Sequence, residues 1–378
     1  MKAYGRAKVS DFLGDAIIYR NLQPLDPRLP SLADLHETVG LPAGVVPRKS
    51  TNDYARVVAQ ILSAGRTLDA PHRKIQRVIF IGDTRLNDGT AFANICAAGG
   101  WPGLAFIAAE RMDEAPKFEI EQRGEHAHVY VANRWASLPD FPAYCAEQGY
   151  TVDESTAVLI DLDKTTLGAR GRNDRVIDQV RVDAAFQTVS ALLGNDFDPP
   201  AFETAYRELN KVAYHPFTTD NQDYLVYLCL ILGSGIFSLG GLVDDIRSGR
   251  VAAFDDFLAE VDVHASELSA TLQGIHHDVQ ARVAAGDPTP FKTFRRNEYR
   301  ATAARMGQLG AESTVEQKLA EEIVITREVY TQALAWLHQG AFLFGLSDKP
   351  DEASIPEPEQ ASQGAQPIHR IETDVVGM

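Results

Sequence analysis

Short apolar runs that end in a polar residue constrain the fold of this chain more than any other feature. RVIFIGD ends at Asp83, AVLID at Asp161 and AFLFGLS at Ser347. Runs without polar alternation are typical of strands that are buried on both faces. Two further runs, over residues 104–108 and 128–132, predict two more strands. Helical patterns separate these strands, so we expect a doubly wound α/β fold with a Rossmann-like parallel sheet.

The strand ends carry the residues that suggest chemistry, because open α/β sheets bind ligands beyond the carboxyl ends of their strands. Asp161 and Asp163 lie two residues apart in IDLDKTTLG. One carboxylate can attack phosphorus and become transiently phosphorylated, and a second can protonate the departing alkoxide. Two acids repel a phosphate dianion, so we expect Mg²⁺ beside them, an ion that prefers carboxylate oxygens and water.

IDLDKTTLG resembles the first signature of the haloacid dehalogenase (HAD) superfamily, an apolar run followed by DxDxT. The resemblance implies that Asp161 is the nucleophile and that Asp163 is the general acid and base. It also implies that Mg²⁺ is held by the Asp161 side chain and the Asp163 backbone carbonyl. Thr165, which ends the motif, is a candidate substrate contact. An acidic turn that caps the next helix would leave the same pattern.

Two other strand ends resemble further HAD signatures. IGDTRLND matches GDxxxxD, which implies that Asp83 is a direct metal ligand and Asp88 a supporting one. AFLFGLSDKP resembles the signature in which a strand ends in Ser or Thr, which implies that Ser347 donates a hydrogen bond to a phosphoryl oxygen. Turns and helix caps use the same residue types, so each match alone has a structural alternative.

The chemistry also needs a lysine that neutralises charge on the phosphoryl group and the nucleophile. Lys49 precedes the helix that leads into the GDxxxxD strand, as in the family's lysine signature, and we favour it. Lys349, two residues after Ser347, is the alternative.

The order of the motifs departs from that of the family. HAD proteins usually have DxDxT, then Ser or Thr, then lysine, then GDxxxD, whereas this chain has Lys49, Asp83, Asp161 and Ser347. The cyclic order is the same, so the resemblance implies a circular permutation, which domains tolerate because their termini often lie close together. The C-terminal segment IHRIETDVV would then supply the edge strand that normally separates the serine from the lysine.

Helical periodicity dominates residues 175–338. We therefore expect a core over residues 1–169, a helical insertion over 170–337, and the rest of the core over 338–378. Residues 350–366 are rich in Pro, Glu, Gln and Ser, which is typical of a flexible linker. In HAD proteins an insertion at this place forms a cap that closes over the active site and selects the substrate.

Several basic residues are candidate contacts for an anionic substrate. Lys292, Arg295 and Arg296 cluster in the insertion, although a solvated helix face with i,i+4 ion pairs is the alternative. Arg170 and Arg172 follow DxDxT and either grip the substrate or stabilise a structural hairpin.

The acidic balance of the chain, a formal net charge of −16, disfavours nucleic acid and anionic membranes as partners. The uncharged run over residues 224–243 is as long as a membrane span, but its glycines favour two buried helical pieces joined at 233–235. The three scattered cysteines and the lack of an apolar leader predict a cytoplasmic protein.

Together these features predict a Mg²⁺-dependent phosphohydrolase that acts on a small phosphorylated metabolite. A phosphomutase or other phosphotransferase is one alternative, and a non-catalytic HAD-like binding protein is another. The sequence does not indicate the oligomeric state.

Overall fold

The computed structural model describes all 378 residues, and the chain divides into two compact units. Unit 1 comprises Met1–Gln179 and Thr302–Met378, and unit 2 comprises Val180–Ala301. Unit 2 is therefore shorter than the predicted insertion over residues 170–337. The difference arises because helix α15 (Arg327–His338) packs in unit 1 against strand β9 of its main sheet.

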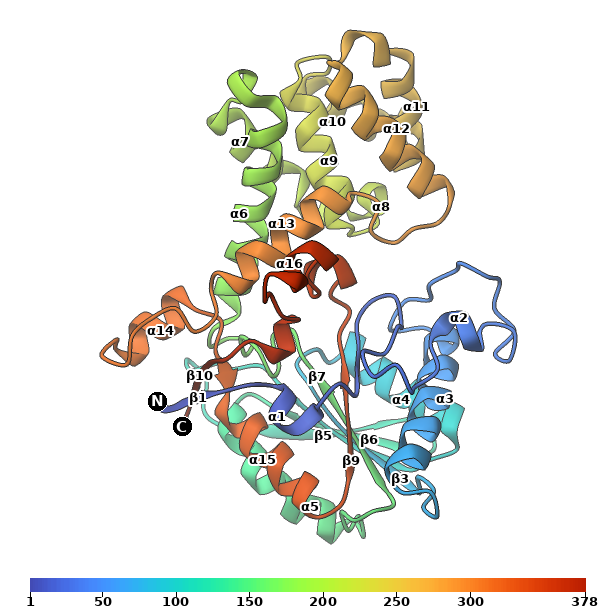
Figure 1. Ribbon diagram of the computed structural model, residues 1–378, viewed down its shortest axis with the longest axis vertical. Coiled ribbons are helices and arrows are strands. Elements are labelled where there is room, and N and C mark those ends of the chain that lie inside the picture. The colour runs from blue at the N-terminus through green and yellow to red at the C-terminus, as the bar shows by residue number, and fades with distance from the viewer. The chain divides into compact units, whose positions relative to one another are not determined.

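The main sheet of unit 1 has seven strands, and all neighbours are parallel except β5 and β6 (Figure 1). Its order is β2 (Ile17–Ile18), β9 (Phe342–Leu346), β7 (Thr156–Asp161), β3 (Arg77–Gly82), β4 (Gly103–Ala108), β6 (Ala127–Ala132) and β5 (Phe118–Arg123). This arrangement confirms the α/β class and the predicted strands. Strands β2 and β5 were not predicted.

Helices cover both faces of this sheet (Figure 1). Phe80 of β3 packs on Phe92 with ring centroids 5.8 Å apart, and it pairs in register with Ala105. Phe106 therefore points to the opposite face, where its ring lies 5.5 Å from that of Phe141. Helices α3 (Asn52–Asp69) and α4 (Asn87–Gly99) cover the first face, and α1 (Ser10–Leu13), α5 (Phe141–Glu147) and α15 cover the second. The short α2 (Leu32–Leu35) begins after Ser31, whose hydroxyl accepts from the Asp34 amide at 3.3 Å.

A second, three-stranded sheet joins the two ends of the chain. It has the order β1 (Lys2–Ala7), β10 (Thr373–Gly377) and β8 (Ile325–Thr326). Only the second half of segment IHRIETDVV forms a strand, because Ile368–Arg370 is a 3₁₀ turn. The prediction that this strand lies at the edge of the main sheet was wrong. The edge of β9 is occupied by β2, whereas β10 is buried between β1 and β8.

Residues 350–366 form ordered turns, so the prediction of a flexible linker was wrong. A short 3₁₀ turn over Asp351–Ala353 precedes α16 (Pro358–Ser362). Ser354 is fully buried, and its hydroxyl donates to the Pro350 carbonyl at 2.8 Å. The prolines that suggested a linker are compatible with these turns, since Pro358 occupies the first turn of α16, where a missing N–H is tolerated.

Unit 2 is helical and has an apolar core of its own. The chain enters it within α6 (Asp174–Leu193) and returns to unit 1 within α13 (Lys292–Ala303), so that α14 (Val315–Glu321) belongs to unit 1. Between α6 and α13 lie α7 (Pro199–Leu209), α8 (His215–Thr218), α9 (Gln222–Gly233), α10 (Leu239–Ser248), α11 (Phe254–Val263) and α12 (Ala270–Ala284). The uncharged run forms α9 and the start of α10, so the two helical pieces are as predicted. Only α9 is buried along most of its length, since Gly240 and Gly241 of α10 are exposed. None of the helices combines the length and apolarity that a membrane span requires.

Candidate functional site

The strand order brings the three predicted strand ends to one edge of the main sheet. Strand β7 lies between β3 and β9. Ile160 pairs with Ile81, and Asp161 pairs with Leu346. Asp83 and Ser347 therefore leave their strands next to Asp161, at the carboxyl ends of parallel strands.

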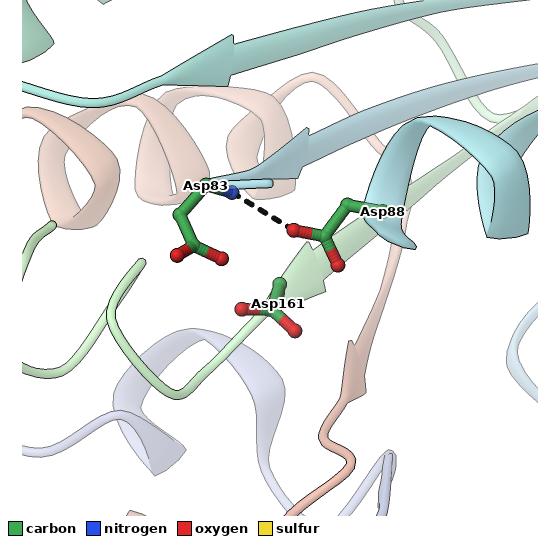
Figure 2. Close-up of side chains that lie close together, drawn as sticks. All are labelled: Asp83, Asp88 and Asp161. Carbon is green, nitrogen blue, oxygen red and sulfur yellow. Dashed lines mark hydrogen bonds between the residues drawn. The ribbon is translucent and has the colours of Figure 1, made fainter. Parts of the chain in front are cut away.

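Three carboxylates converge at this edge (Figure 2). Asp83, Asp88 and Asp161 each place one oxygen within 4.8 Å of the others. All three side chains are buried. Such a cluster of hard oxygen donors is suited to a divalent cation such as Mg²⁺.

Asp88, at the start of α4, is fixed by the strand end that it faces. Its Oδ2 accepts hydrogen bonds from the Asp83 amide at 3.0 Å (Figure 2), the Thr84 amide at 2.8 Å and the Thr84 hydroxyl at 2.7 Å. Its Oδ1 accepts from Lys49 at 2.7 Å. Both oxygens are thus already engaged, so Asp88 acts as a positioning group for the loop that carries Asp83. Sequence reasoning missed Thr84, although a hydroxyl four residues before an acid at a helix start is a typical local pairing.

Lys49 supplies positive charge to the cluster. Its ammonium donates to Asp88 Oδ1 and also to Asp161 Oδ1, which is 112 residues away in sequence. The two carboxylates favour the charged ammonium against the effect of burial, and they raise the pKa of Lys49 well above its ordinary value. The loop before α3 holds Lys49 in place, since the Thr51 hydroxyl caps the helix by accepting from the Tyr54 amide at 3.3 Å.

The cluster nevertheless has too little positive charge to keep all three acids ionised. Burial and the neighbouring carboxylates of Asp161 and Asp88 raise the pKa of Asp83 to about 8. Burial raises the pKa of Asp161 to about 7, although Lys49 opposes this shift. For Asp88, burial is outweighed by Lys49 and by its hydrogen bonds, so its pKa falls to about 2. A cation beside Asp83 and Asp161 would relieve this deficit.

The loop after β7 carries the remaining DxDxT residues. Asp163 is half-buried, and its carboxylate does not belong to the three-acid cluster. The Thr166 hydroxyl donates to the Asp161 carbonyl at 2.8 Å, and the Thr326 hydroxyl donates to the Thr165 carbonyl at 2.6 Å. The Thr165 hydroxyl is buried close enough to Asp161 to favour its ionised form, yet it makes no hydrogen bond of good geometry.

Ser347 and Lys349 are buried just beyond β9. The Ser347 amide donates to the Ile18 carbonyl at 3.0 Å, and its hydroxyl oxygen accepts from the Lys349 amide at 3.1 Å. A hydroxyl can accept and donate at once, so the Ser347 proton can still serve a ligand.

The predicted arginines after DxDxT differ in their surroundings. Arg170 is partly exposed, and its guanidinium contacts the Asp83 carboxylate, so it lies at the cluster. Arg172 is buried, and it pairs with Glu110 at 2.7 Å and with Glu328 at 2.9 Å. These two acids satisfy the guanidinium of Arg172, which favours the structural alternative for this residue.

The predicted basic residues of the insertion lie around α13 of unit 2. Arg295 is buried between Asp223 and Glu298, with both ion pairs at 2.6 Å. Lys292 pairs with Asp287 at 2.9 Å. Arg296 is exposed. The ion pairs of Arg295 and Lys292 favour a structural role for both residues.

Comparisons of the chain with protein-family models, with curated proteins and with solved structures found no match. The functional argument therefore depends on the geometry of this site and on the motifs that form it.

Proposed function

We propose that this protein is a Mg²⁺-dependent phosphohydrolase of the HAD type, which cleaves a small phosphate monoester through an aspartyl-phosphate on Asp161. The observation that carries the proposal is the Lys49 ammonium between Asp161 and Asp88, with Asp83 beside them. Four residues from three distant segments thus meet at the carboxyl ends of adjacent strands. A structural role alone would not require three buried acids that share one lysine and one arginine.

The donor set fits Mg²⁺. Asp83 and Asp161 would hold the ion through their side chains, with the Asp163 carbonyl as the backbone ligand, while Asp88 positions the loop. A bound Mg²⁺ supplies positive charge that offsets repulsion between the phosphate and the carboxylates. The raised pKa values of Asp83 and Asp161 support this assignment, since Arg170 and Lys49 do not fully offset the burial and mutual repulsion of these carboxylates.

The proposed reaction has two steps, each a displacement at phosphorus. The Asp161 carboxylate attacks phosphorus, and the bond from phosphorus to the ester oxygen breaks as Asp163 gives its proton to the departing alkoxide. Water then attacks the aspartyl-phosphate while Asp163 takes up a proton, which releases phosphate and regenerates Asp161. Lys49 neutralises charge on the nucleophile and the phosphoryl oxygens, and Ser347 donates a hydrogen bond to one of them.

The strand arrangement supports the HAD resemblance independently of the motif residues. The strand that carries Asp161 lies between the strand before Asp83 and the strand before Ser347. The adjacent ends of the chain in β1 and β10 support the circular permutation, because Lys2 pairs with Gly377.

The test is turnover of an aryl phosphate by the wild type and by Asp161→Asn, with and without Mg²⁺. We expect Mg²⁺-dependent turnover by the wild type and a loss of about 10³-fold or more in the variant, since a carboxamide is a poor nucleophile. Asp26→Asn, at a carboxylate that pairs with Arg28 outside the cluster, is the matched control. Equal turnover by Asp161→Asn and wild type would exclude the nucleophile. Phosphate transfer to a second alcohol in place of water would favour the phosphotransferase alternative.

A further inference from the structure

Tyr54 is a buried residue whose polar group has no function in the fold. It lies in the first turn of α3, five positions after Lys49. Its side chain is only 3% exposed, and its ring belongs to the same buried cluster as Ile18, Phe80 and Leu346. Its hydroxyl is buried and has no hydrogen-bond partner. A buried hydroxyl without a partner is unfavourable for folding alone, so an isosteric phenylalanine would serve the core better.

The charged neighbours of the Tyr54 hydroxyl belong to the candidate site. The Lys49 ammonium lies 5.9 Å from the ring centroid of Phe80, which belongs to the same buried cluster as Tyr54. Lys49, Asp161 and Asp88 also act electrostatically on the hydroxyl, as does Asp348 just beyond β9. Burial keeps the phenol neutral, because it raises the pKa of Tyr54. The hydroxyl therefore keeps its proton at neutral pH and is available as a hydrogen-bond donor.

A second hydroxyl lies beside the same acids. Thr165 Oγ1 is buried next to Asp161 and favours its ionised form, but it makes no hydrogen bond of good geometry. The Ser347 proton is a third available donor at the same edge of the sheet. A buried hydroxyl whose proton has no acceptor is complementary to a ligand rich in acceptor oxygens, and a phosphoryl group is such a ligand.

We propose that the Tyr54 hydroxyl is a phosphoryl-binding group, which donates a hydrogen bond to an oxygen of the phosphate that Asp161 attacks. This role rests on the proposed function, because it requires a phosphate beside Asp161. It extends the site to a residue of the apolar cluster. The start of α3 and the loop before it would then supply two ligand contacts, through Tyr54 and Lys49.

Tyr54→Phe tests the role because it removes only the oxygen. The full-length protein is titrated with inorganic phosphate in the presence of Mg²⁺, and binding is followed by calorimetry. We expect the dissociation constant of phosphate to rise about tenfold or more, since the lost bond is to a charged acceptor. The urea midpoint without ligand should stay unchanged or rise, because the variant removes an unpaired hydroxyl. The three tryptophans, Trp101, Trp135 and Trp336, all lie in unit 1 and report its unfolding by fluorescence.

Tyr19→Phe is the matched control. Tyr19 is also fully buried in unit 1, but its hydroxyl contacts His369 Nδ1 at 3.4 Å. This variant should bind phosphate as the wild type does. Wild-type phosphate affinity in Tyr54→Phe would overturn the role of Tyr54, and so would a lowered midpoint, which would reveal a structural partner. If the wild type itself neither binds phosphate nor turns over an aryl phosphate, the proposed function fails together with this role. If the wild type turns over an aryl phosphate and Tyr54→Phe binds phosphate with unchanged affinity, only the proposed role of Tyr54 is rejected.

Discussion

The Lys49 ammonium is buried between two carboxylates, so its charge contributes to the stability of the fold as well as to the site. Its side chain is 2% exposed, and those of Asp88 and Asp161 are nearly as inaccessible. Removing one member of such a group leaves uncompensated charge in a medium that solvates it poorly. Stability and chemistry are therefore coupled at this residue.

Lys49→Met retains most of the side-chain length and removes the charge. We expect it to reduce turnover by about 100-fold or more and to lower the free energy of unfolding by roughly 3–5 kcal/mol without Mg²⁺. Added Mg²⁺ should recover part of this stability, because it supplies positive charge to the same carboxylates. Urea unfolding followed by tryptophan fluorescence measures the free energy of unfolding of unit 1, both without and with Mg²⁺. Lys349→Met is the comparison: if it loses turnover while Lys49→Met keeps it, Lys349 is the catalytic lysine.

The sequence predicted the residues of the cluster, but not the contacts that give each one its environment. Asp83, Asp161 and Lys49 follow from motifs that are local in sequence. Arg172, in contrast, was a candidate substrate contact because it follows DxDxT. Its structural role could not be recognised, since its partners Glu110 and Glu328 lie 62 and 156 residues away in sequence. A pairing over such a distance depends on the tertiary fold, so no local pattern indicates it.

At the scale of elements, the loop after β7 is held from outside by the rest of unit 1. The Arg170 carbonyl accepts from the Glu110 amide at 2.9 Å and from Trp135 Nε1 at 3.1 Å. The next residue, Gly171, has a φ of 77°, and a Cβ there would lie 2.1 Å from the Glu110 carbonyl oxygen. Both the backbone conformation and the close approach thus require glycine.

Gly171→Ala should lower the free energy of unfolding by about 2 kcal/mol or more, since it combines left-handed strain with a clash against the backbone. Gly149→Ala separates the two effects. Gly149 has a φ of 82° but open space around its Cβ position, so we expect only about 1 kcal/mol of strain there. Thermal unfolding of both variants makes the comparison. Equal losses would show that the contact with Glu110 is not restrictive.

The strands that were predicted from the sequence have a local signal, whereas those that were missed depend on pairing with a strand elsewhere in the chain. The buried strands around Asp83 and Asp161 are apolar throughout, which is a local property. Strand β5 lies at the sheet edge and carries charges, and β2 has only two residues whose partner is β9. Strand β10 was predicted but assigned to the wrong sheet, because an alternating pattern does not identify the neighbouring strand.

At the scale of the whole molecule, strand pairing and ion pairs join the N-terminal and C-terminal segments within unit 1. Strand β1 pairs with β10, and Asp15 binds both His369 and Arg370 across more than 350 positions of sequence. Lys318 forms a further buried ion pair with Asp374 at 2.6 Å. These contacts make the C-terminal segment part of the core of unit 1, which the proline-rich composition of residues 350–366 did not reveal.

The contacts of His369 in the C-terminal segment predict a pH dependence of stability. Burial lowers the pKa of His369 below its ordinary value of 6.5, although Asp15 opposes the shift. Between pH 6.5 and the lowered pKa of the folded state, the unfolded chain binds a proton that the folded chain does not. The stability from neutral His369 is therefore fully present above pH 6.5, and it is lost as the pH falls through the lowered folded pKa.

The urea midpoint of unit 1, followed by tryptophan fluorescence, is compared at about pH 7.5 and about pH 5.5 with Mg²⁺ present, because without the ion the raised pKa values of Asp83 and Asp161 oppose the effect of His369. Under these conditions we expect the midpoint of the wild type to fall. The fall should be smaller in His369→Asn, which has no titrating imidazole, although this variant starts from a lower midpoint because it loses contacts to Asp15 and Tyr19. His72→Asn, at an exposed histidine, should retain the wild-type slope. An unchanged slope in His369→Asn would mean that other groups determine the acid sensitivity. A parallel series without Mg²⁺ tests the acids of the site. Mg²⁺ should shift the urea midpoint through these acids without removing the contribution of His369.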